Sequence, residues 1–303
     1  MTSARGAELG VHARLLGMAL LWGASWPAGR TLALAMPPLA GSAWRFSIAV
    51  VLLLAWLRWQ LGGWPRLTRR QWAGLAIAGT VGVFAYSAFF MLALQRVEAS
   101  RAAVVVTTNP VFTTLLAAWL FKERFNLRIA LGLALAVAGA AIVLTQGAPR
   151  KLLAGDIGTG EWLLLGCVAS WSAYSLMGKR LMAGIDSLVA TVVTAAIGAL
   201  LLWAAALAFE GPALVARSIA TLSWPGWVSI VFLAVGATVL AYAWFYRGIA
   251  VLGAGTASSY ISLVPVFGVA SSVLVLGEPL DASLLAGGAL AIAGVVVANR
   301  ARQ

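Results

Sequence analysis

The polar and aromatic side chains that lie inside the long apolar stretches of this chain could bind a small molecule. Most of them fall in pairs three or four residues apart, which places both members of a pair on one face of a helix. The candidate binding residues are Trp22, Ser25, Tyr86, Phe90, Thr107, Asn109, Trp171, Tyr174, Ser258 and Ser262. Aromatic rings offer apolar contact area, and hydroxyl, amide and indole groups fix a ligand's orientation. A packing role stays open for each, because Ser and Thr also line helix interfaces in membranes, and Trp and Tyr anchor helix ends.

The chain offers little for catalysis or for binding a metal. Its nine acidic residues lie in predicted loops or at the ends of apolar stretches, and it has one histidine, His12, and one cysteine, Cys167. No Ser/His/Asp set, metal-ligand cluster or phosphate-binding loop can be built from these residues. We therefore expect no enzyme, no cofactor and no metal site. We also expect no proton coupling through a carboxylate within the membrane.

One charged side chain, Arg45, falls inside an apolar stretch. A central arginine costs roughly 2.5–3.5 kcal/mol on membrane-insertion scales, so its position needs a reason. It could bind a substrate carboxylate, or it could donate structural bonds to main-chain carbonyls near the outer face. Of the two, we favour the structural role.

Two prolines, Pro110 and Pro265, also lie inside apolar stretches. Each should kink its helix and free the carbonyl four residues earlier. Thr107 and Ser262 are near enough in sequence to compensate. These kinks could be hinges, or they could be static bends.

The elements that would position these residues are membrane-spanning helices. The chain is 62% hydrophobic and 10% charged over 303 residues, far from the composition of a soluble domain. Its apolar stretches have the length that a helix needs to cross a bilayer. We predict an all-α integral membrane protein with ten spans, at about 13–34, 39–58, 72–95, 99–121, 127–146, 161–180, 187–208, 225–248, 254–276 and 282–299.

The two halves of the chain resemble each other. At an offset of 155 residues, Pro110-Val111-Phe112 matches Pro265-Val266-Phe267, and Glu123 matches Glu278. We predict two five-helix repeats, at 1–154 and 155–303. Because five is odd, the second repeat must enter the membrane from the opposite side. Such inverted repeats are typical of secondary transporters, although a duplication could also build a simple bundle.

Smaller features of the repeats have two interpretations each. Glu123 and Glu278 could form matched cap or gate contacts, or they could be solvated charges. Gly139 and Gly294 permit close helix approach, in a scaffold or in a dimer contact.

The basic residues predict the orientation. Fourteen of the 21 Lys and Arg residues fall on the side of both predicted termini and six on the other side. The side richer in positive charge is cytoplasmic. We therefore expect both termini in the cytoplasm of a bacterial cell, with the chain in the inner membrane. The net charge of +12 serves this orientation, and we expect no nucleic-acid partner.

The order of these motifs resembles a known family. Two five-span halves carrying P-V-F…E-R and P-V-F…E-P, with Trp22-Gly23 in the first span and Arg45-Phe46 in the second, are similar to the EamA type of the drug/metabolite transporter superfamily. The aromatic interior is most similar to YddG-like exporters of aromatic amino acids. The resemblance implies a ten-helix exporter that works by alternating access.

We therefore expect an exporter of small metabolites, most of all amino acids including aromatic ones. Its cavity should be lined by spans 1, 3, 4, 6, 8 and 9. Export of drugs, nucleobases or sugar derivatives is an alternative. A non-transporting scaffold or lipid-handling subunit is a second alternative. The expected partners are a small-molecule substrate and the lipid bilayer, in a monomer or a homodimer.

Overall fold

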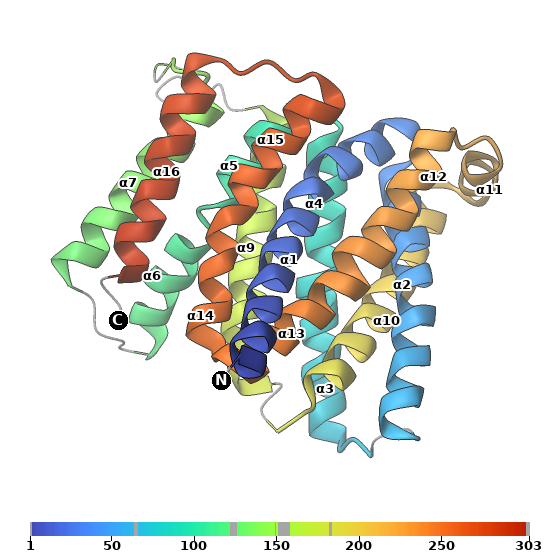
Figure 1. Cartoon of the computed structure of the whole chain (residues 1–303). Coiled ribbons are helices and arrows are strands. Elements are labelled where there is room, and N and C mark those ends of the chain that lie inside the picture. The colour runs from blue at the N-terminus through green and yellow to red at the C-terminus, as the bar shows by residue number, and fades with distance from the viewer. Residues whose placement is uncertain are drawn as a thin grey trace.

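The computed structural model describes residues 2–63, 66–121, 126–148, 150, 158–181 and 184–300, and every regular element within these ranges is a helix (Figure 1). The first half of the chain contains α1 (Thr2–Ala35), α2 (Pro38–Leu61), α3 (Arg69–Gly79), η1 (Thr80–Ala85), α4 (Tyr86–Leu94), α5 (Ala99–Val106), α6 (Asn109–Phe121) and α7 (Leu127–Leu144). The second half contains α9 (Thr159–Leu181), α10 (Ser187–Ala205), η2 (Ala206–Glu210), α11 (Pro212–Ala220), α12 (Trp224–Val231), η3 (Phe232–Leu240), α13 (Ala241–Leu252), α14 (Ala254–Ser259), η4 (Tyr260–Leu263), α15 (Val264–Leu276) and α16 (Ala282–Arg300). The predicted repeat boundary at 154 lies outside the described residues.

The helices begin and end at residues suited to those positions. Thr68 and Gln71 form a reciprocal capping box at the start of α3. The side chain of Asp186 accepts hydrogen bonds from the first turn of α10. At the end of α2, Gly62 adopts a left-handed conformation with φ 66°, which glycine enters without steric cost. Local capping interactions therefore fix these helix ends.

Membrane-spanning helices make up most of the described chain. Seven helical segments there are long and apolar enough to cross a bilayer, and Ala282–Ala298 is a shorter apolar helix. The seven segments are Pro38–Gln60, Arg69–Leu94, Ala99–Trp119, Leu127–Leu144, Ser187–Glu210, Trp224–Leu252 and Gly255–Leu276. The long helices α1 and α9 occupy the predicted first and sixth spans. The protein is thus a multi-pass membrane protein built from helices.

Four of the long helical segments are interrupted, and the interruptions correspond between the halves. π-helical turns occur at Thr80–Ala85 and at Phe232–Leu240, which overlap when shifted by 155 residues. The α5–α6 segment breaks after Val106, and the α14–α15 segment passes through a 3₁₀ turn at Tyr260–Leu263. Helices α6 and α15 then restart at positions 109 and 264, again 155 residues apart. Interruptions of this kind are frequent at functional sites.

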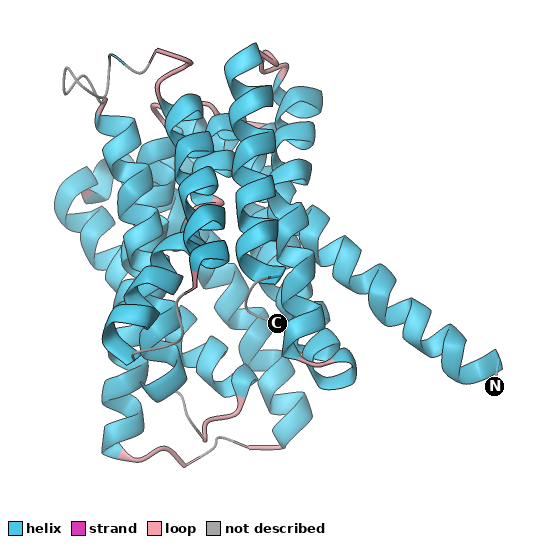
Figure 2. Ribbon diagram, turned by 90° about the vertical axis from the view of Figure 1, so that its left-hand side faces the viewer, coloured by secondary structure: helices cyan, strands magenta, loops and turns pink. Residues whose placement is uncertain are grey.

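The helices run roughly alongside one another, and the first turns of α1 extend beyond the bundle (Figure 2). Helix α1 packs against α13 and α15, α2 against α10, and α4 against α9. Helix α1 begins and α16 ends at the same end of the bundle, the lower end in Figure 1.

Helices α7 and α16 form a pair at one side of the bundle (Figure 1). Glycines bring their backbones into contact: a Cβ atom added at Gly139 would lie 2.4 Å from the Ala291 nitrogen, and one at Gly294 would lie 2.4 Å from the Ala136 nitrogen. Gly139 and Gly294 thus serve packing within the chain, as the scaffold interpretation predicts.

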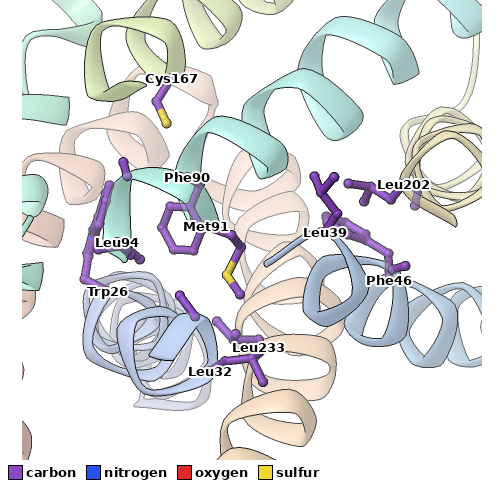
Figure 3. Packing of buried hydrophobic residues seen from close by; sticks show 14 of the residues in the cluster. Trp26, Leu32, Leu39, Phe46, Phe90, Met91, Leu94, Cys167, Leu202 and Leu233 are labelled. Carbon is purple, nitrogen blue, oxygen red and sulfur yellow. The ribbon is translucent and has the colours of Figure 1, made fainter. Parts of the chain in front are cut away.

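The core centres on α4. Phe90 and Met91 are buried between α1, which contributes Trp26 and Leu32, and α2, which contributes Phe46 (Figure 3). Phe90 and Trp26 have ring centroids 5.1 Å apart. This packing joins the first three predicted spans beside the cavity described next.

Candidate functional site

A cavity of about 460 Å³ lies inside the bundle, and all ten candidate binding residues line it together with Pro110 and Pro265. The volume falls in the range of small-molecule sites. Its wall comes from both halves of the chain, and residues of all the helix interruptions take part, including Gly82 in η1, Thr238 in η3 and Ile261 in η4. The interruptions thus present irregular backbone to a cavity, where such backbone is tolerated within a membrane.

Aromatic rings form a continuous series along one wall. Trp26 contacts Phe90, Phe90 stacks with Tyr86 at 6.1 Å, Tyr86 lies 5.7 Å from Trp171, and Trp171 lies 5.9 Å from Tyr174. A second group of rings joins Trp22 of α1 to α13: Trp22 lies 5.4 Å from Tyr242 and 5.5 Å from Phe245. The cavity therefore offers rings to a ligand from two sides.

Three of the candidate residues use their polar hydrogen within the protein. The Trp22 indole N–H donates to the Ala237 carbonyl at 2.9 Å. The Ser25 hydroxyl donates to the Trp22 carbonyl at 2.6 Å, and the Thr107 hydroxyl donates to the Val104 carbonyl. The two hydroxyl oxygens can still accept a bond, and all three side chains can contact a ligand through their carbon atoms. The Oδ1 atom of Asn109, by contrast, is buried and has no partner in the described structure.

The cavity wall includes three helices besides the expected spans 1, 3, 4, 6, 8 and 9. Helices α2 and α10 also reach the cavity, through Arg45 and Phe46 and through Thr191, Thr194 and Ala195, and α16 adds Val295. In the first spans of the two halves the sequences align at an offset of 149 residues, which matches Trp22 with Trp171 and makes Arg45 the counterpart of Thr194. Tyr242 and Thr113 were missed as well. Tyr242 lies inside the predicted span 225–248 and carries both a ring and a hydroxyl, so the pattern that indicated Tyr86 also applies to it.

The prolines interrupt their helices rather than kinking continuous ones. Pro110 is the second residue of α6 and Pro265 the second residue of α15, where the missing N–H costs little. The expected compensation was wrong in detail: the Thr107 hydroxyl bonds the Val104 carbonyl and not that of Val106. The Ile261 carbonyl accepts a main-chain bond from Val264.

Glu278 joins three segments at the end of the bundle opposite the start of α1. Its two carboxylate oxygens accept hydrogen bonds from the main-chain nitrogens of Ala99 and Ser100, both at 2.8 Å. It therefore caps α5, which has no side-chain cap of its own. The Arg30 Nε lies 3.5 Å from the same carboxylate. The cap interpretation is correct for Glu278, whereas Glu123 lies outside the described residues.

A second set of charges lies beside this cap. Arg101, which is buried, pairs with Glu98 at 2.6 Å and with Asp281. Hydrogen bonds from Ser283 and Leu284, with the nearby Arg101 charge, lower the pKa of Asp281 to about 2. Asp281 therefore stays ionised throughout the physiological pH range. We call Arg30, Glu98, Arg101, Glu278 and Asp281 the charged cluster.

The chain belongs to the EamA-like transporter family, whose sequence profile matches residues 12–145 and again residues 158–300. The predicted family is thereby confirmed, and the protein is a membrane transporter.

Relatives along most of the chain are named as transporters. The chain is 28% identical over 292 residues, 96% of its own length and 94% of the relative's, to an uncharacterized transporter, YyaM, of Bacillus subtilis. It is 29% identical to a probable amino-acid metabolite efflux pump of Salmonella typhimurium, over 81% of this chain and 84% of that protein. It is 27% identical to a probable terminal-alkyne amino-acid exporter of Streptantibioticus cattleyicolor, over 75% and 72%.

A solved crystal structure shares the fold. It superposes with a TM-score of 0.63 at 23% identity and covers 97% of this chain and 98% of its own.

Proposed function

We propose that this protein exports small metabolites, most of all amino acids including aromatic ones, across the bacterial inner membrane. The observation that carries the proposal is the cavity, because its rings and polar groups converge from both halves of the chain inside a membrane bundle. A non-transporting scaffold would have no need of such a cavity. The relatives named for amino-acid efflux and export support the choice of substrate.

The proposed architecture is ten spans in two inverted five-helix repeats, 1–154 and 155–303. The two matches to the family profile and the paired interruptions at corresponding positions support it. Helix α1 begins and α16 ends at one end of the bundle, in keeping with two cytoplasmic termini (Figure 1).

In the proposed mechanism the two ends of the cavity open in turn. The charged cluster closes one end through the cap of Glu278 on α5. Opening that end separates Glu278 from α5, while the interrupted segments bend at Pro110 and Pro265. No acidic side chain lines the cavity in the described chain, so the mechanism uses no carboxylate there for proton exchange.

The test is efflux from proteoliposomes loaded with labelled phenylalanine, threonine, methionine or adenine, with and without a pH gradient. Saturable flux of the amino acids that is indifferent to the gradient is the expected result. Flux that follows the gradient would contradict the facilitative mechanism. Flux of adenine alone would favour the nucleobase alternative, and no flux of any of the four would remove the proposed substrates.

A further inference from the structure

Arg45 is the single charged side chain lining the cavity within the described residues. It lies in α2 and is 8% exposed. Around it stand aromatic rings: its guanidinium carbon is 4.5 Å from the centroid of the Phe46 ring and 5.5 Å from that of Phe90. The cavity therefore carries one positive charge in apolar surroundings.

The protein leaves this charge largely without partners. Its Nη2 donates to the Ser87 hydroxyl at 3.2 Å, and its Nε is buried with no hydrogen-bond partner. Among the described residues, no carboxylate lies within 4.0 Å of Arg45, although Arg30 and Arg101 both have one. No bond from Arg45 to a main-chain carbonyl is present in the same residues, so the structural role that we favoured from the sequence is not the one observed.

An arginine with free donors in such a place matches a carboxylate. Arginine presents a planar fork that binds a carboxylate through two parallel hydrogen bonds. Buried charges in membrane proteins are otherwise paired or bound to carbonyls. A cation in the same cavity would meet an uncompensated positive charge.

We propose that Arg45 binds the carboxylate of the transported substrate, so that the cavity selects small organic acids and zwitterions over amines. This inference rests on the proposed function and narrows its substrate class. The ring series from Phe90 through Tyr86 to Trp171 contacts the apolar part of the substrate.

The experiment compares the binding of four compounds that all carry a phenyl ring. Phenylalanine and 3-phenylpropionate carry a carboxylate, whereas phenylalanine amide and 2-phenylethylamine do not. Binding is followed by thermal shift of the purified full chain, and flux by counterflow in proteoliposomes. We expect both carboxylates to bind the wild-type protein at least tenfold more tightly than the two amines. Equal binding of the acid and the amide would overturn the inference.

Two variants separate the positive charge of Arg45 from the planar geometry of its guanidinium. Arg45→Gln removes the charge, and Arg45→Lys keeps the charge without the planar group. A hydrogen bond to a charged group corresponds to roughly 10- to 100-fold in affinity. Arg45→Gln should therefore lower the affinity for the two carboxylates by about that factor, and it should not lower the affinity for the two amines. Arg45→Lys should recover part of the loss. Should Arg45→Gln not fold, Ser87→Ala removes the one bond that orients the guanidinium and keeps the charge. It should weaken carboxylate binding several-fold, and unchanged carboxylate affinity in that variant would count against the inference.

The two readouts keep this inference apart from the proposed function. Carboxylate-selective binding without flux would support Arg45 as the recognition residue and remove the export function. Saturable flux without preference for carboxylates would remove the role of Arg45 alone. Neither binding nor flux of any of the four would remove both.

Discussion

Individual aromatic residues of the cavity differ in whether their polar group is already hydrogen-bonded within the protein. Tyr86 and Trp171 are half-buried and contact each other at 5.7 Å, and no described hydrogen bond involves the Tyr86 hydroxyl. The Trp22 indole N–H, in contrast, donates to the Ala237 carbonyl. We therefore expect different effects from replacing Trp171 and from replacing Trp22.

Replacing Trp171 by alanine should raise the substrate concentration for half-maximal flux about tenfold. The ring supplies apolar area and edge contacts that no neighbour can replace, worth about 1 kcal/mol or more. Trp119→Ala is the control, because that ring is 77% exposed on α6 and does not line the cavity. Equal effects of the two variants on the half-maximal concentration in proteoliposomes would contradict a binding role for Trp171.

Replacing Trp22 by phenylalanine should lower stability and leave substrate affinity within about twofold. The change removes the bond that ties α1 to η3, which corresponds to about 1 kcal/mol, and it keeps an aromatic ring at the cavity wall. Thermal melting in detergent measures the first effect and competition binding the second. A large loss of affinity with unchanged melting would mean that the indole N–H binds substrate instead.

At the scale of elements, the α7–α16 pair depends on glycine at the contact. A Cβ atom at Gly287 would lie 2.7 Å from the Gly139 carbonyl oxygen, whereas one at Gly288 would meet only Val104 at 3.5 Å. Gly287→Ala should therefore destabilise the protein by about 1–3 kcal/mol through overpacking. Gly288→Ala is a matched control on the next residue of the same helix. Melting temperatures of the two variants check this, and an equal shift in both would exclude the backbone contact as the cause.

The charged cluster should hold its end of the bundle closed. Glu278→Gln removes the charge and one of the two acceptor oxygens, leaving a buried N–H of α5 without a partner at a cost of about 1–3 kcal/mol. We expect faster labelling of a cysteine at position 113 by an impermeant thiol reagent from that side, in a Cys167→Ser background. Glu98→Gln should change the rate little, because Arg101 keeps its pair with Asp281 and Glu278 keeps both of its bonds to α5. Unchanged labelling in Glu278→Gln would show that the cap does not control opening.

At the scale of the whole molecule, the bundle has two chemically different ends. The end that carries Arg70 is rich in basic residues, and the other end carries α11. A cysteine replacing Ala213 in α11 should be labelled in intact cells, and one replacing Arg70 only after permeabilisation. Both positions are exposed, so access alone does not distinguish them. The reverse pattern of labelling would invert the proposed orientation.

The family and the helical membrane class could be read from the sequence, because both depend on local order. Long apolar stretches must form helices in lipid, where every main-chain polar group needs an internal partner. The candidate residues could also be named from local order. Helical periodicity places the members of each pair on one helix face, and these faces line the cavity.

The tertiary structure alone decided which polar groups are used up within the protein. Whether Arg45 has a partner, and that Glu278 caps a helix starting 179 residues earlier, depend on contacts between distant segments. Periodicity carries no information on such contacts. The residue types of the cavity wall could therefore be predicted from the sequence. That the Arg45 guanidinium in this wall has no carboxylate partner was decided by how the helices pack.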